Sequence, residues 1–288
     1  MGTLLNKIDF AVIINVKNAN PNGDPLNGNR PRINYDGIGE LTDVCIKRKI
    51  RNRLMEAGSA IFVQSDDNRI DGYPSLRKRA EGEISKDNWK DEKKFREAVC
   101  KKWIDVRTFG QVFAYEGDKK GEGVSIGIRG PVSIHSAFSI APVLERISSI
   151  QITKSVSSVG DGTKRSSDTM GMKHRVDHGV YVFYGSMNPQ LASKTGFSDE
   201  DAKAIKKVLA NLFENDASSA RPEGSMEVYK VFWWKHNCKN GQYSSAKVHR
   251  SLKVDVKPDV DVPNDVEEDY IVTLQPLPEL TPEIIPGR

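Results

Sequence analysis

Hydrophobic and polar residues alternate near the start of the chain, over residues 7–16. The even positions from Ile8 to Val16 are all apolar, whereas Asp9 and Asn15 lie among the positions between them. This period of two is typical of a half-buried β-strand. A loop rich in Asn, Pro and Gly follows at residues 18–32. Such residues favour tight turns and leave amide groups free to face an acceptor.

A helical period follows this loop. The apolar residues recur at i, i+4, i+8 and i+11, namely Ile46, Ile50, Leu54 and Ala57. At about 100° per residue they share one stripe, which predicts an amphipathic helix with a buried face. Thr42 is a suitable N-cap and Gly58 a suitable stop.

Further elements alternate along the rest of the chain. Helical stretches are expected at residues 89–103 and 198–215, the latter with Ser198 as N-cap and Asp201 at N3. Strand character is expected at residues 106–113, 124–134, 179–187, 228–234 and 246–256. The order β-α-insertion-β-β-arm-β-α-β predicts an α+β sandwich in which two helices cover an antiparallel sheet.

The chain of 288 residues can bury a substantial core. We interpret it as one elaborated domain, 1–288, with three additions. Residues 65–105 are highly charged and predict a helical insertion, and residues 152–176 are polar and turn-rich, as expected of a projecting arm between strands. Residues 257–288 predict an extended acidic, Pro-rich tail.

The charges are unevenly distributed. The formal net charge is only +4, but the part up to Arg107 is rich in Lys and Arg, and residues 255–269 are acidic. Two such ends could attract each other between neighbouring copies, although a solvated acidic loop is the simpler interpretation. In the basic helix, Lys47, Arg48 and Arg51 share one flank, and Lys49 and Arg53 lie on the other. Beside the amide-rich loop, this flank indicates a phosphate backbone as ligand.

Several other functions lack their sequence signals. The glycines of the loop do not end in Gly-Lys-Ser/Thr, and Cys45, Cys100 and Cys238 are too far apart for a thiolate zinc site. Buried free thiols are expected instead, and no cofactor is indicated. No stretch approaches the roughly 20 apolar residues of a membrane span, and no signal-peptide pattern is seen, so we expect a cytoplasmic protein.

Two features of the arm invite a chemical interpretation. Met170 and Met172 are apolar residues in a polar stretch, which could wedge against bases or pack on a neighbouring subunit. His174 and His178 lie four residues apart but lack the Glu of a metalloprotease motif, and as part of an extended segment they would share a face. Polar contact to RNA or to a neighbour is the preferred interpretation of the histidines, with no catalytic set assigned.

Several runs together resemble the CRISPR-associated Cascade backbone family, the Cas-seven superfamily, and most closely its type I-C branch. They are Asn20-Pro21-Asn22-Gly23-Asp24-Pro25, Thr42 through Arg51, Arg107-Thr108-Phe109-Gly110, Arg129-Gly130-Pro131-Val132, Asp168-Thr169-Met170-Gly171 and His174 through Gly179. The resemblance covers residues 7 to about 256.

The resemblance implies an RRM-like (ferredoxin-like) palm with an antiparallel sheet, a helical insertion and a protruding β-hairpin thumb. It also implies a non-catalytic subunit whose copies assemble head to tail along a CRISPR RNA and leave its bases open to a target DNA strand. Other Cascade subunits, a foot or processing subunit and a large subunit, are the further implied partners. The residues expected to bind RNA are Asn20, Asn22, Gly23, Lys47, Arg48, Arg51, Arg107, Lys154, Lys164, Arg165, Met170 and Arg175.

Two alternatives come from other functional classes. One is a ribonuclease that processes the guide precursor with His174 or His178 as general acid or base. The other is a generic single-stranded RNA-binding protein without assembly partners.

Overall fold

The computed structural model describes residues 2–115, 124–154 and 169–288. Its centre is an antiparallel sheet in the order β14-β11-β1-β10-β8-β4, with β7 and β9 also paired to β10. The expected mixed α and β structure with an antiparallel sheet is therefore confirmed. The strands of this sheet are β1 (Ile8–Ala19), β4 (Ile38–Leu41), β7 (Val132–Ile134), β8 (Ala137–Pro142), β9 (Ile147–Lys154), β10 (Thr169–Met187), β11 (Met226–Lys235) and β14 (Glu283–Pro286).

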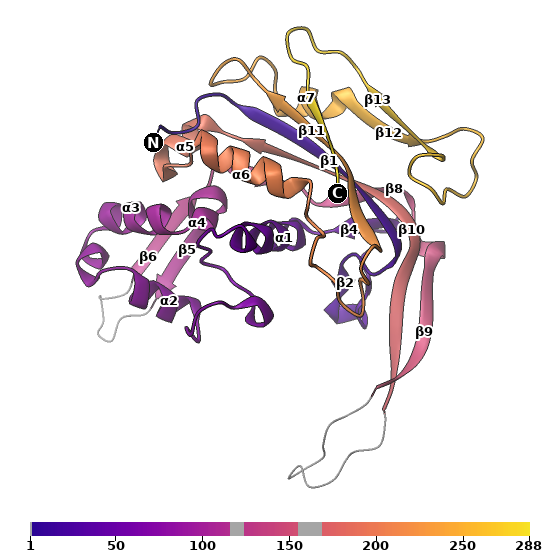
Figure 1. Ribbon diagram of the computed structural model, residues 1–288, viewed down its shortest axis with the longest axis horizontal. Helices are drawn as coiled ribbons and strands as arrows, with labels where there is room; N and C mark the ends of the chain where they lie inside the picture. The colour runs from indigo at the N-terminus through magenta and orange to yellow at the C-terminus, as the bar shows by residue number, and fades with distance from the viewer. Residues whose placement is uncertain (1, 116–123, 155–168) are drawn as a thin grey trace.

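One face of the sheet is covered by α1 (Asp43–Glu56) and α6 (Asp199–Leu209), as Figure 1 shows. Ile46, Ile50 and Leu54 of α1 enter the core with Ile205 and Leu209 of α6. The predicted apolar stripe is confirmed at Ile46, Ile50 and Leu54, whereas its fourth member, Ala57, is exposed at the C-cap of α1. Burying each such side chain contributes about 1.5–3 kcal/mol of transfer free energy, which fixes the helix on the sheet.

The opposite face of the sheet is covered by the C-terminal part of the chain. It carries α7 (Ser245–Ser251) and the antiparallel pair of β12 (Leu252–Val256) and β13 (Tyr270–Leu274). The prediction of one strand over residues 246–256 was wrong in its first half. Ser244 caps α7 by accepting a hydrogen bond from the backbone N–H of Lys247, so a helical turn precedes the strand.

A second hydrophobic core, apart from that of the sheet, lies within residues 62–128. Phe62, Phe95, Trp103 and Phe113 pack together there, with ring centroids of Phe62 and Trp103 4.7 Å apart. Its elements are α2 (Leu76–Glu83), α3 (Glu92–Lys102), α4 (Ile104–Phe109) and the antiparallel pair β5 (Gly110–Tyr115) and β6 (Val124–Arg129).

Residues 106–113 are not the single strand that the sequence predicted. Residues up to Phe109 end the helix α4, and the strand begins at Gly110. Gly110 has φ +81°, and a Cβ there would meet Ile128 O at 2.2 Å and Gly130 N at 2.7 Å. The switch from helix to strand thus needs glycine at position 110, because the paired strand β6 leaves no room there for a side chain. The predicted strand at 124–134 is likewise divided, by Gly130 and Pro131, into β6 and β7.

The helix predicted at residues 198–215 is confirmed in its first part. Ser198 and Asp201 form a reciprocal capping box, and α6 ends at Leu209, earlier than predicted. Leu212 and Phe213 are still buried, but in a turn that follows the helix.

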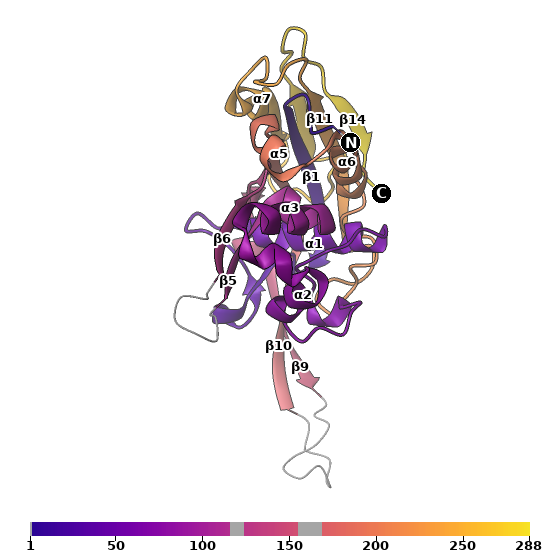
Figure 2. The ribbon, with the colours of Figure 1, turned by 90° about the vertical axis from the view of Figure 1, so that its left-hand side faces the viewer.

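The strands β9 and β10 continue beyond the sheet as a hairpin. Their pairing begins with Ile147 opposite Val176 and ends with Lys154 opposite Thr169. Both views of the ribbon show this hairpin projecting from the body (Figures 1 and 2). The residues expected for the arm therefore include paired strands that leave the body together.

The segment 257–288, expected as an extended tail, contributes strands. β13 pairs with β12, and β14 pairs with β11 at the sheet edge. The short elements of the chain are β2 (Gly23–Asp24), η1 (Pro25–Asn27), β3 (Arg30–Pro31), η2 (Asp66–Asn68), η3 (Lys86–Lys90), η4 (Leu144–Arg146) and α5 (Pro189–Thr195). Among the described residues, no helix is both long and apolar enough to cross a membrane.

Candidate nucleic-acid interface

The Asn/Pro/Gly loop is fastened to the start of α1 by one asparagine side chain. Asn22 Oδ1 accepts hydrogen bonds from the backbone N–H and from the hydroxyl of Thr42, both at 3.0 Å. Thr42 is the N-cap of α1, and its hydroxyl accepts from the backbone N–H of Cys45 at 3.2 Å. Asn22 therefore positions the loop on the helix, and its side-chain oxygen is already used within the chain.

Asn20 and Gly23 shape the loop from inside. Asn20 is buried, and its Nδ2 donates to Asn29 O at 2.6 Å. Gly23 pairs with Pro31, which joins β2 to β3. At the tip, Leu26 of η1 is almost fully exposed. The loop is thus closed by its own polar groups and presents its tip and its Arg side chains outward.

The basic flank of α1 is divided between a surface cation and anchored ones. Lys47 is partly exposed and paired with Asp43 at 2.8 Å. Arg48 donates to Val63 O at 2.7 Å, and burial lowers its pKa. Arg51 pairs with the buried Asp105 at 3.1 Å. Of the three predicted RNA-binding residues on this helix, Lys47 has the most accessible geometry for a phosphate.

Arg107 also has a partner inside the chain. Its Nε and Nη2 donate to Asp201 at 2.9 and 2.7 Å, and its Nη1 donates to Cys100 O at 3.2 Å. This two-pronged bond ties α4 to the capping box of α6. Arg107 therefore makes a structural contact. Its partner, Asp201, is 94 residues away in the chain, so the pair could not be identified from the sequence.

The other flank of α1 is buried. Lys49 is only 4% exposed, forms an ion pair with Asp216, and lies 5.2 Å from the ring centroid of Phe213. Arg221 donates to the same carboxylate at 3.3 Å and to Asn20 O at 3.5 Å. Burial lowers the pKa of Lys49, and Asp216 opposes that shift. This cluster links α1, the turn after α6 and the Asn/Pro/Gly loop.

The projecting hairpin contacts this loop near its base. His174 Nδ1 and Ser149 Oγ are 2.8 Å apart, and Arg30 Nη1 donates to Ser149 Oγ at 3.2 Å. On the same face of β10, farther out, Met170 and Met172 are 64% and 51% exposed. The hairpin thus presents soft apolar side chains next to a polar junction, on the side that faces the loop.

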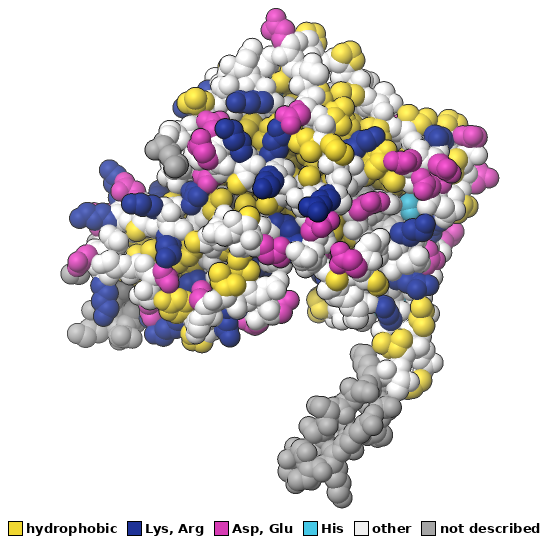
Figure 3. All heavy atoms as spheres, viewed as in Figure 1, with side chains coloured by type: hydrophobic (Ala, Val, Ile, Leu, Met, Phe, Trp, Pro, Cys, Tyr) yellow, Lys and Arg dark blue, Asp and Glu magenta, His cyan; other side chains and the backbone are white. Residues whose placement is uncertain are grey.

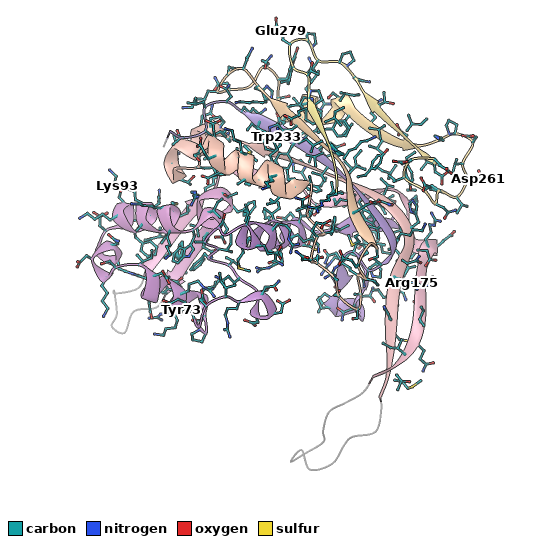
Figure 4. All side chains as sticks on the ribbon, in the orientation of Figure 1. Tyr73, Lys93, Arg175, Trp233, Asp261 and Glu279 are labelled. Atoms are coloured by element: carbon teal, nitrogen blue, oxygen red, sulfur yellow. The ribbon has the colours of Figure 1, made fainter. Side chains whose placement is uncertain are left out.

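Arg175 lies on the other face of the hairpin. Its guanidinium is 3.7 Å from Asp177, and the residue is labelled in Figure 4, where the hairpin leaves the body. Of the remaining predicted arm residues, Lys164 and Arg165 lie outside the described residues, as does the side chain of Lys154.

His174 and His178 do not share a site. His178 is only 3% exposed, with its ring centroid 6.0 Å from that of Tyr270, and neither of its ring nitrogens has a hydrogen-bond partner. Burial lowers the pKa of His178 to about 4. His174 instead contacts Ser149, and its pKa is lowered by burial and by Arg30. The expectation of a shared face was wrong: Val176, two residues after His174, packs in the core on the side of α1, whereas Val180, two residues after His178, packs in the core on the opposite face of the sheet.

Sequence reasoning did not single out three arginines that border the loop. Arg30 and Arg32 flank Pro31, and Arg221 comes from the turn after α6. The first two could have been found, since cations at the return of an amide-rich loop fit a phosphate ligand. Among the described residues, no group of three or more His, Cys, Asp and Glu is placed to hold a metal ion. The thiol of Cys100 is buried, and those of Cys45 and Cys238 are partly exposed.

The chain is similar to proteins of one family. A family model described as "CRISPR-associated protein Cas7" matches residues 6–275. The chain is 28% identical over 229 residues to a CRISPR-associated protein Cas7 of Haloferax volcanii, covering 75% of this chain and 67% of that protein.

The chain is also similar to chains of solved structures. A chain of a structure titled CRISPR RNA-guided surveillance complex, pre-nicking, matches 79% of this chain and 78% of its own length, at 13% identity and a TM-score of 0.46. A chain of a second structure, titled CRISPR RNA-guided surveillance complex, matches 79% of this chain and 68% of its own, at 14% identity and a TM-score of 0.40. Because the family model spans most of its length, this chain belongs to the CRISPR-associated Cas7 family.

Proposed function

We propose that this chain is a non-catalytic backbone subunit of a Cascade surveillance complex, which holds a CRISPR RNA and assembles head to tail along it. Family membership supports the proposal. The observation that carries it is the projecting β9–β10 hairpin, whose exposed Met170 and Met172 lie on the face that Ser149 and Arg30 join to the Asn/Pro/Gly loop. Such a hairpin can act as a thumb that separates bases while the loop and α1 hold the backbone.

Within this proposal, the guide phosphates are held by cations that remain accessible. Lys47 lies on α1, and Arg30 and Arg32 lie at the return of the loop. Arg175, on the other face of the hairpin beside Asp177, is not part of this group. Lys47 and Arg32 can exchange a surface ion pair for a phosphate, because such exposed pairs contribute only about 0–1 kcal/mol, and Arg30 can exchange its hydrogen bond to Ser149. Asn20, Asn22 and Gly23 then act by holding the loop in shape, and Arg51 and Arg107 by anchoring the helices.

The architecture gives this proposal its parts. β1, α1, β8, β10, α6 and β11 follow in the order βαββαβ, with sheet order β11-β1-β10-β8, which we interpret as an RRM-like palm. Residues 65–105 would be the helical insertion and residues 152–176 the thumb. On the sequence runs given above we place the chain in the type I-C branch. A foot or processing subunit and a large subunit would be its partners in the complex.

Sequence recognition would then come from base pairing between the guide and the target DNA strand, while the protein holds the shape and charge of the guide. Because copies add head to tail through unlike surfaces, the assembly stays open and can follow the length of the RNA.

A truncated hairpin tests this proposal. Ile150 and Lys173 are directly paired, so a two-residue Asn-Gly turn can replace residues 151–172. The folded body should keep its stability, because the Met170 and Met172 side chains removed are exposed. We expect a single copy to bind a short RNA still, whereas ordered multimers on a guide-length RNA, measured by sedimentation velocity, should disappear.

Other outcomes identify the alternatives. Even coating of unrelated RNA that the truncation does not change would indicate a generic single-stranded RNA-binding protein. Cleavage of a guide precursor by the purified protein, lost on His174→Ala, would indicate a ribonuclease. His178→Ala tests the second histidine in the same assay, although its burial leaves no open path to a substrate.

A further inference from the structure

A hollow of about 570 Å³ lies between residues 35–37, η4 and residues 261–263, beside the base of the hairpin. Its apolar lining is unusually exposed: Tyr35 is fully exposed, Val262 is 60% exposed and Leu144 is 49% exposed. Isolated exposed apolar side chains are ordinary, but three that line one hollow indicate a surface that is covered in an assembly.

The rim of this hollow is acidic. Asp36, Glu145, Asp177 and Asp261 line it, and the cation among them, Arg146, is bound to Pro263 O and Asn264 Oδ1. These negative charges would repel an RNA backbone, so the hollow does not fit the guide. They fit a partner surface that is basic.

The loop behind the rim, residues 257–269, is held in place by its own hydrogen bonds. Asp269 accepts from the backbone N–H groups of Asn264 and Asp265 at 2.6 and 2.9 Å, and Arg146 fastens the loop to η4. A partner can therefore bind without the entropy loss of ordering a mobile loop.

A basic surface lies at the opposite end of the molecule. The exposed side chains of Lys93, Lys94, Lys101 and Lys102 lie on α3 and outnumber the exposed Glu92 and Glu97 of the same helix, so its exposed side is net positive. Figure 3 shows blue side chains along the edge formed by the insertion and magenta ones along the edge that carries the acidic loop. Lys93 and Asp261 mark these two edges in Figure 4.

We propose that the acidic hollow lined by Tyr35, Leu144 and Val262 takes the basic face of α3 from a second copy of this chain. The two surfaces differ, are opposite in charge and lie at opposite ends of the long axis, so their pairing is heterologous and repeats without closing. This inference rests on the proposed head-to-tail function and names the surfaces that would meet.

Sedimentation velocity of the purified chain at low salt, without RNA and on a guide-length RNA, tests the pairing. Asp261→Lys should raise the dissociation constant for self-association about tenfold, because an attraction becomes a repulsion. The matched control is Glu279→Lys, the same change at an exposed position distant from the hollow, which should leave it unchanged. Tyr35→Ala with Leu144→Ala should weaken association as well, with little effect on folding because both side chains are exposed.

Exchanging the two charges between the surfaces tests whether α3 is the face that meets the acidic hollow. Lys93→Glu alone should weaken association, and Lys93→Glu combined with Asp261→Lys should restore most of it. Equal behaviour of Asp261→Lys and Glu279→Lys, no association of the wild type in either condition, or no rescue by the exchange would each overturn the proposal. Binding of a single copy to short RNA, unchanged in all these variants, separates this outcome from a failure of the proposed RNA-binding function.

Discussion

At the scale of single residues, the amide side chains of the loop hold its conformation and bind it to the start of α1. Asn22→Ala removes the acceptor for the backbone N–H and the hydroxyl of Thr42, and leaves these donors at the start of α1 without their partner. We expect a loss of about 1–2 kcal/mol in the free energy of unfolding. Urea denaturation measures it, with Asn27→Ala in the exposed η1 as the control. Equal stability of the two variants would contradict the positioning role of Asn22.

His178 gives the stability a dependence on pH. Burial lowers its pKa to about 4, below the ordinary value of 6.5 that it regains on unfolding. Between these values the unfolded chain binds more protons, so the contribution of His178 is fully present above pH 6.5 and is lost as the pH falls towards 4. Between pH 7 and pH 5 we expect a loss of about 2 kcal/mol.

The matched variant for this prediction is His178→Leu. Urea denaturation at pH 7 and pH 5 should show a smaller difference for the variant than for the wild type, since His174 and His249 titrate in both. An unchanged difference would mean that the His178 ring takes up protons as freely in the folded chain as in the unfolded one.

At the scale of elements, the basic helix α1 is partly a structural device. Arg51→Ala leaves Asp105 without its guanidinium partner, although the backbone N–H groups of Phe62 and Val63 still donate to it at 2.8 and 3.0 Å. We expect a loss of about 2–3 kcal/mol in stability, because Asp105 is only 1% exposed. Lys47→Ala removes a surface pair and should change stability by less than about 0.5 kcal/mol. Thermal unfolding of both variants checks the contrast, and similar losses would refute it.

The same scale shows what the sequence could predict. The strand β1, the stripe of α1 and the capping box of α6 depend on neighbours within a few residues, and each was predicted. The boundary at Gly110 was missed because it is set by pairing with β6, whose backbone lies too close to position 110 for a Cβ. Residues 246–256 were assigned wholly to a strand because Val248 and Leu252 could be buried in a strand or in a helix. The N-cap at Ser244 favours the helix in the first half of this segment.

The candidate interface could be predicted as a region more readily than residue by residue. The loop, α1 and the hairpin were all expected, and the structure connects the loop to α1 through Asn22 and Thr42 and to the hairpin through Arg30 and Ser149. Whether a given cation is accessible depends on a distant carboxylate: Asp105 for Arg51, and Asp201 for Arg107. No spacing in the sequence reports such pairs, since the partners lie 54 and 94 residues away.

At the scale of the whole molecule, two kinds of surface lie apart. The hairpin, the loop and Lys47 form the proposed RNA surface, while the acidic hollow and the basic face of α3 form the proposed contact between copies. A subunit built in this way can hold a guide and pass it to the next copy, because its positive and negative charges lie on different surfaces. The net charge of +4 conceals this arrangement.

The proposed path of the RNA is tested by the salt dependence of binding to an RNA short enough for one copy. We compare the wild type with the triple variant Arg30→Ala, Arg32→Ala and Lys47→Ala. The control removes three exposed lysines elsewhere, in Lys235→Ala, Lys239→Ala and Lys253→Ala. Losing about three phosphate contacts should flatten the slope of log K against log salt by roughly 2 units, and the control should keep the wild-type slope. The same slope in the first variant as in the wild type would contradict the proposed path of the RNA.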